Sequence, residues 1–135
     1  MKLFTDGSCD NFQDIKDRTM VIVVTDDTGA VLVEKTKVGG SSNIAELWGV
    51  AEAMLWAKES QVAEIEVFTD SRNNLAWLKG NVGKKLNDRN AVMDLLTAIE
   101  NLKRCVNMSV SWIPITEWFR KPLAPDCASG RVATR

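Results

Sequence analysis

The sequence of 135 residues contains no histidine. This absence excludes nucleophilic catalysis of the Ser-His-Asp and Cys-His kinds, and it excludes every metal site that relies on imidazole ligands. Carboxylates are the main acid–base groups that remain near neutral pH. We therefore expect any catalysis by this chain to depend on aspartate and glutamate side chains.

Cysteine is scarce as well. The three cysteines are an odd number and include no C-x-x-C pair, which argues against both a disulfide framework and a zinc site. A reducing compartment fits this pattern, so we expect a cytoplasmic protein. The residues concerned are Cys9, Cys105 and Cys127.

The chain also lacks long apolar runs and a strong charge of one sign. No apolar stretch of about 18 residues or more occurs, so we expect no membrane span, and the first residues do not resemble a secretory signal. The length fits a single domain over residues 1–135 with a core of its own. A net charge of −1 weakly disfavours a dedicated nucleic-acid-binding protein.

Hydrophobic periodicity divides the chain into strands and helices. Strands at 20–25 and 30–37 flank an Asp-Asp-Thr-Gly turn, which predicts a hairpin. Later strands alternate with helices, so part of the sheet should be parallel. We predict an α/β fold with a mixed sheet packed by helices. The expected strands cover 2–9, 20–25, 30–37, 64–71 and 107–115, and the expected helices cover 43–58, 72–79 and 88–103.

Two of these strands end with the same pattern, Phe-Thr-Asp followed by a small residue, around Asp6 and Asp70. Ligands of open α/β sheets collect at the carboxyl ends of parallel strands. If the two strands are parallel neighbours, the aspartates repel each other and a divalent cation removes the repulsion. Oxygen ligands suit Mg²⁺ or Mn²⁺. Taken singly, each aspartate is better explained as a turn or cap residue, with Asp70 as the N-cap of the following helix, whereas the repeated pattern leaves both explanations open.

Glu46 and Asp126 are further acidic candidates, each with a structural alternative. Glu46 lies three residues after Asn43, so the two resemble a capping box at the start of a helix. A glutamate in a first helical turn also points toward the carboxyl edge of the sheet. Asp126 follows Pro125 and suits an N-cap of a short terminal turn. The residues alone leave both alternatives open.

Taken together, these segments resemble ribonuclease H. The opening strand of that family is similar to FTDGSCDN, its glutamate-bearing helix to NIAELWGVAEAM, and its second aspartate motif to VFTDS. VSWIP followed by APDCAS is similar to its last strand and final aspartate. The resemblance covers nearly the whole chain in order. It implies a ribonuclease H-like five-stranded mixed sheet, three antiparallel strands followed by parallel strands, flanked by helices.

The resemblance implies an endoribonuclease that hydrolyses the RNA strand of RNA–DNA hybrids as a monomer. Two ions per site, Mg²⁺ or Mn²⁺, would activate water and stabilise the leaving 3′-oxygen, giving 5′-phosphate and 3′-hydroxyl ends. Asp6 would bridge the ions, which accounts for a carboxylate inside a strand. The implied catalytic and metal-binding residues are Asp6, Glu46, Asp70 and Asp126.

Residues beside these carboxylates suit a bound hybrid. Hydroxyl and amide groups before the glutamate fit 2′-hydroxyls in a minor groove, and basic residues after Asp70 fit phosphates. On charge alone, the basic residues are explained by a solvated surface. Trp77 suits either stacking on DNA sugars or core packing, and Trp118 suits a hydrophobic plug. The expected substrate-binding residues are Gly7, whose bareness would let nucleic acid approach, and Ser8, Ser42, Asn43, Arg72, Asn73, Lys84 and Lys85.

The chain departs from the family pattern in four places. The loop at 12–19 has no glycine, and the basic protrusion is reduced to GNVGKKLND. The segment KPLAPDCAS replaces an Asn-x-x-Ala-Asp motif, and the loop before it offers Arg120 and Lys121 for product release where many members have a histidine. An arginine there does not titrate near neutral pH. We expect a compact, divergent member with weak hybrid affinity, and turnover reduced more than binding.

Three other functions stay open. The chain would be a catalytically silent hybrid- or protein-binding module of the same fold, a related nuclease that cuts DNA, or a structural α/β domain. Retention of four like charges argues against the silent module, because an abandoned metal site has no reason to keep them. The Ser-Ser-Asn segment before Glu46 favours RNA over DNA.

Overall fold

The computed structural model describes residues 1–9, 17–86 and 88–113. Within these ranges the chain forms one five-stranded sheet with strand order β3-β2-β1-β4-β5 and three helices. Strands β1, β2 and β3 are antiparallel, whereas β1–β4 and β4–β5 are parallel. The elements are β1 (Lys2–Cys9), β2 (Thr19–Asp26), β3 (Val31–Val38), α1 (Ser42–Glu59), β4 (Glu64–Thr69), α2 (Arg72–Leu78), α3 (Arg89–Leu102) and β5 (Asn107–Trp112).

This arrangement confirms the predicted mixed sheet. The hairpin of β2 and β3 turns at Asp26, whose Oδ1 accepts hydrogen bonds from the Thr28 backbone at 2.8 Å and the Ala30 backbone at 3.1 Å. Gly29 supplies the positive φ of +90° that this turn requires. None of the described helices combines the length and apolarity needed to span a membrane.

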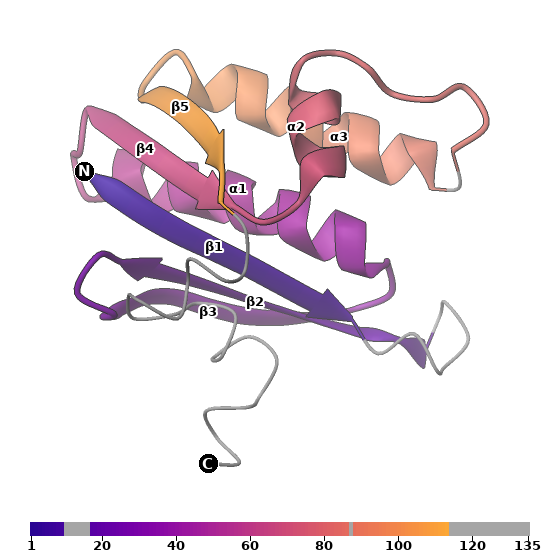
Figure 1. Cartoon of the computed structure of the whole chain (residues 1–135), viewed down its shortest axis with the longest axis horizontal. Coiled ribbons are helices and arrows are strands. Elements are labelled where there is room, and N and C mark those ends of the chain that lie inside the picture. The colour runs from indigo at the N-terminus through magenta and orange to yellow at the C-terminus, as the bar shows by residue number, and fades with distance from the viewer. Residues whose placement is uncertain (10–16, 87, 114–135) are drawn as a thin grey trace.

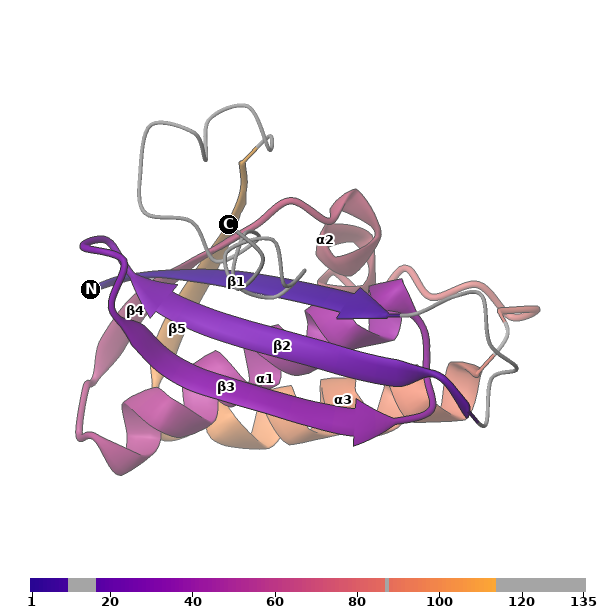
Figure 2. The ribbon, with the colours of Figure 1, turned by 90° about the horizontal axis from the view of Figure 1, so that it is seen from below.

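Helix α1 packs on one face of the sheet, and α3 packs alongside α1 (Figure 1 and Figure 2). The core lies between α1 and the central strands and includes Leu3, Leu47 and Met54. Trp77 of α2 joins this core with 7% of its surface exposed. Of the two roles considered for Trp77, core packing is therefore the one that the structure supports, because a buried indole presents no face to a ligand.

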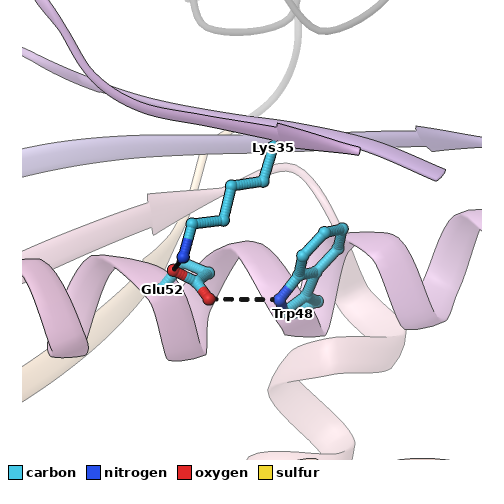
Figure 3. Close-up of polar contacts among 3 residues, drawn as sticks. All are labelled: Lys35, Trp48 and Glu52. Carbon is cyan, nitrogen blue, oxygen red and sulfur yellow. Dashed lines mark hydrogen bonds and ion pairs between the residues drawn. The ribbon is translucent and has the colours of Figure 1, made fainter. Parts of the chain in front are cut away.

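A second contact ties β3 to α1 outside the core. Lys35 of β3 forms an ion pair with Glu52 of α1 at 2.8 Å, and the Trp48 indole N–H donates to the same carboxylate at 3.3 Å (Figure 3). The carboxylate of Glu52 is thus held by a cation and a neutral donor. This environment contrasts with that of Glu46, less than two turns earlier on the same helix.

Candidate metal centre

The two aspartates of the repeated Phe-Thr-Asp pattern are brought side by side by the parallel pairing of β1 with β4. The last residue pair in register joins Phe4 to Phe68, so Asp6 and Asp70 each lie two residues farther along. The carboxyl ends of both strands point toward the end of the molecule where α1 begins (Figure 1). Asp6 lies inside β1 rather than at its end, because β1 continues its pairing with β2 as far as Cys9.

Glu46 reaches the same place from α1. The helix begins earlier than the sequence predicted: Ser41 is the N-cap, and its hydroxyl accepts a hydrogen bond from the Ile44 backbone at 3.3 Å. The predicted capping box of Asn43 with Glu46 is therefore wrong. Because Glu46 lies beyond the first turn, its side chain has no capping role and is available to the aspartates.

The approach of α1 to β1 depends on Gly7. A Cβ atom at this position would meet the backbone of Ala45 and Glu46 well inside contact distance. The bareness of Gly7 at this buried position thus makes room for the helix, whereas its expected contact with nucleic acid stays a prediction. This close contact holds Glu46 next to Asp6.

Three carboxylates consequently converge. One oxygen each from Asp6, Glu46 and Asp70 lies within 4.8 Å of the others. Asp6 is the most buried, with 6% of its surface exposed, and the other two side chains are half-buried. They come from three different elements, so packing of the whole fold fixes their separation.

Burial and the neighbouring like charges strongly perturb the pKa of the glutamate. Burial, followed by the neighbouring Asp70 and then Asp6, raises the pKa of Glu46 from 4.5 to about 9, and a hydrogen bond from Ser71 offsets part of this. Glu46 therefore holds a proton at neutral pH when no cation is bound. The Oδ1 atom of Asp70 is buried and finds no hydrogen-bond partner within the described part of the chain.

These observations fit a hard divalent cation. A cation held by these carboxylates would remove their repulsion, displace the proton of Glu46 and give the Oδ1 of Asp70 a partner. The donor set consists of oxygens alone, which suits Mg²⁺ or Mn²⁺. Asp126, the expected fourth carboxylate, lies outside the described residues, as do Arg120, Lys121 and Trp118.

An open pocket of about 380 Å³ lies beside the carboxylates. Three of the expected substrate-binding residues, Asn43, Arg72 and Asn73, line it together with Glu46 and Asp70. The other expected contacts are not among its lining residues: Ser8 and Ser42 are half-buried, and Lys84 and Lys85 are exposed between α2 and α3.

Sequence reasoning missed three residues around this pocket. Ser71 is the N-cap of α2, accepting a hydrogen bond from the Asn74 backbone at 3.2 Å, so the alternative role of Asp70 as that cap is wrong. Asn74 is fully buried, and its amide donates to the Asn43 carbonyl at 3.1 Å, joining α2 to the start of α1. Trp112, the last residue of β5, lines the pocket.

A mixed five-stranded sheet with three acidic side chains gathered beside its central parallel pair defines an α/β protein with a candidate metal site. Comparison with known proteins makes this class more specific. The RNase H family model matches residues 1–115. The chain therefore belongs to the RNase H family. No curated protein sequence matches it.

Solved structures share the fold at low sequence identity. RNase H1 from the halophilic archaeon Halobacterium salinarum superposes with a TM-score of 0.71 at 17% identity, over 99% of this chain and 98% of that one. The N-terminal RNase H domain of Rv2228c from Mycobacterium tuberculosis gives 0.67 at 19% identity, over 95% of each chain. LC11-RNase H1, solved in complex with an RNA/DNA hybrid, gives 0.66 at 18% identity, over 98% of each chain. These likenesses establish the fold.

Proposed function

We propose that this protein is a metal-dependent endoribonuclease that hydrolyses the RNA strand of RNA–DNA hybrids. The observation that carries the proposal is the convergence of Asp6, Glu46 and Asp70 within 4.8 Å in a member of the RNase H family. The proposal takes Asp126 as a fourth ligand, and two Mg²⁺ or Mn²⁺ ions as the cofactor. The hybrid found with the similar LC11-RNase H1 supports the substrate class.

Bound divalent ions would supply a lowered pKa for the attacking water and a positive charge near the leaving 3′-oxygen. The protein's own contribution is to hold its carboxylate oxygens in place. Glu46 must give up its proton on loading, because burial and the adjacent carboxylates raise its pKa to about 9. Asp70 offers its buried Oδ1 oxygen, and the proton that Glu46 gives up is the one that would otherwise lie between these two carboxylates.

The pocket beside the carboxylates orients the hybrid. Asn43 and Asn73 are exposed amides that can both donate and accept, which suits the 2′-hydroxyl and the sugar–phosphate backbone. Arg72 is an exposed, permanently charged donor suited to a phosphate. Because the chain has no histidine, proton transfer to the leaving group has to involve water or carboxylate rather than imidazole.

The test is cleavage of an RNA–DNA hybrid labelled on the RNA strand, with Mg²⁺ or Mn²⁺, beside duplex DNA and duplex RNA. We expect cleavage of the hybrid alone, with 5′-phosphate and 3′-hydroxyl ends and none after EDTA. Hybrid binding without cleavage would instead indicate a silent binding module, and cutting of duplex DNA would indicate a DNA nuclease. The single domain over 1–135, the monomeric state and the cytoplasmic location remain predictions.

A further inference from the structure

Trp112 occupies an unusual place for a large aromatic side chain. It is the last residue of β5, in register with Thr69 at the end of β4. Its side chain is 38% exposed and lines the pocket that contains Glu46 and Asp70. More than a third of this large apolar residue stays in contact with water, so burial alone does not account for its position.

The indole makes two directed contacts. Its Nε1 donates to the carbonyl oxygen of Asp70 at 3.2 Å, and the guanidinium of Arg72 lies over its ring, 4.3 Å from the ring centroid. Pairing of β5 with β4 does not need this hydrogen bond, because the Ile113 backbone already donates to Thr69 at 2.9 Å. The indole therefore adds a restraint on Asp70 at the point where β4 has ended.

The contact with the indole also restricts where Arg72 can lie. A guanidinium held over a ring face by a cation–π contact still has its N–H donors available to a planar or tetrahedral oxyanion. Within the described ranges, the ion pairs present lie elsewhere, and none includes Arg72. In the part of the chain that the structure describes, no carboxylate forms an ion pair with its guanidinium.

We propose that Trp112 is a positioning residue: it stacks the Arg72 guanidinium at the mouth of the pocket so that it binds a backbone phosphate of the nucleic acid, and it fixes the main chain of Asp70. The proposal rests on the proposed function. It adds a role for an aromatic side chain that touches neither the substrate nor an ion and acts through two neighbours.

Three variants separate the two contacts. Trp112→Phe keeps a ring under Arg72 but loses the N–H donor, Trp112→Leu loses both, and Arg72→Gln removes the charge. Trp56→Phe is the matched control, because Trp56 is half-buried on α1 and lines a different pocket. Hybrid binding is measured by fluorescence anisotropy across a salt series, after EDTA and with Ca²⁺ in place of Mg²⁺, and thermal unfolding is recorded for each variant.

We expect Trp112→Leu to weaken hybrid binding about two- to five-fold, the range for an exposed cation–π contact. Arg72→Gln should weaken it at least as much and lower the salt slope by about one. A double variant that combines Trp112→Leu with Arg72→Gln should bind no worse than Arg72→Gln alone, because Trp112 acts on the phosphate only through Arg72. Trp112→Phe and Trp56→Phe should keep the wild-type salt slope.

Unchanged binding by Trp112→Leu, or additive losses in the double variant, would overturn the inference even if the protein cleaves hybrids. A loss of thermal stability with no change in binding or salt slope would also overturn it, since that is the result of a purely structural role. Failure of the wild-type protein to bind hybrid at all would overturn both this inference and the proposed function.

Discussion

Raising the pH should destabilise the metal-free protein in a range where most proteins change little. The pKa of Glu46 is raised from 4.5 to about 9 by burial and by Asp70 and Asp6. The folded state therefore binds a proton that the unfolded state releases. The stability that this proton gives is complete below the ordinary glutamate pKa of 4.5, and it is lost as the pH rises toward the folded-state pKa of about 9.

The magnitude follows from linkage. Between about pH 5.5 and about pH 7.5, one proton separates the two states, so the free energy of unfolding falls by about 1.4 kcal/mol per pH unit, or about 3 kcal/mol over the interval. This is a large share of the roughly 5–15 kcal/mol that holds a small domain folded. Because the chain has no histidine, no imidazole titrates in the same interval to obscure the effect.

The assay is urea unfolding at the two pH values in EDTA, for the wild-type protein and for Glu46→Gln. Glutamine mimics the protonated glutamate, so this variant should show a flat profile, and its advantage over the wild type should grow by about 3 kcal/mol across the interval. Glu52→Gln on the same helix is the control. Its carboxylate pairs with Lys35 outside the cluster, so the variant should keep the wild-type slope. Parallel profiles for the wild type and Glu46→Gln would refute the reasoning.

Three further predictions address the same centre. Asp70→Asn should abolish hybrid cleavage and leave the EDTA-treated protein as stable as the wild type or slightly more so, because like-charge repulsion falls; normal turnover or a collapse in thermal stability would contradict this. Gly7→Ala should lower stability by about 1–3 kcal/mol in urea unfolding, because the added methyl meets the α1 backbone. Gly83→Ala is the control and should be neutral, because a Cβ added there meets no described atom within 4 Å beyond its chain neighbours. Arg120→Ala should reduce the cleavage rate partially at unchanged hybrid affinity, and an unchanged rate would return Arg120 to the solvated surface.

The sheet and the proximity of Asp6 to Asp70 could be predicted because both depend on local sequence patterns. Period-two strands, a turn sequence and a repeated Phe-Thr-Asp motif are each visible in a few residues, and the parallel pairing of β1 with β4 places Asp6 and Asp70 together. Glu46 could also be named as a candidate on a helix, although its neighbours in the sequence do not show that it reaches the two aspartates.

The capping alternatives considered from the sequence, Asn43 for α1 and Asp70 for α2, are wrong for a physical reason. Ser41, Ser42 and Asn43 are consecutive residues that are all capable of capping, and the choice among them depends on where α1 meets β1 at Gly7, which is a tertiary contact. The same ambiguity exists between Asp70 and Ser71 at the start of α2. The choice of cap matters in both helices, because Asn43 and Asp70, which do not cap, are left to line the pocket.

Trp112 was missed because its role depends on register across two strands. No local pattern around Trp112 predicts a contact with Asp70 or Arg72, which lie about forty residues earlier. Only the pairing of β5 with β4 brings these residues together. Periodicity assigns such a residue to a strand and goes no further. Residues that act through neighbours on other elements are therefore the part of a site that sequence patterns reveal least.

The rigidity of the frame explains why the carboxylates cannot relieve their repulsion by moving apart. Asp6 lies in a central strand paired on both sides, Glu46 lies on a helix whose backbone touches that strand at Gly7, and Asp70 is held through its carbonyl by Trp112. The metal-free protein therefore responds by taking up a proton on Glu46. A cation that replaces this proton should raise stability more at pH 7.5 than at pH 5.5, and it should release protons as it binds, so cation affinity and fold stability are coupled through the same oxygen atoms.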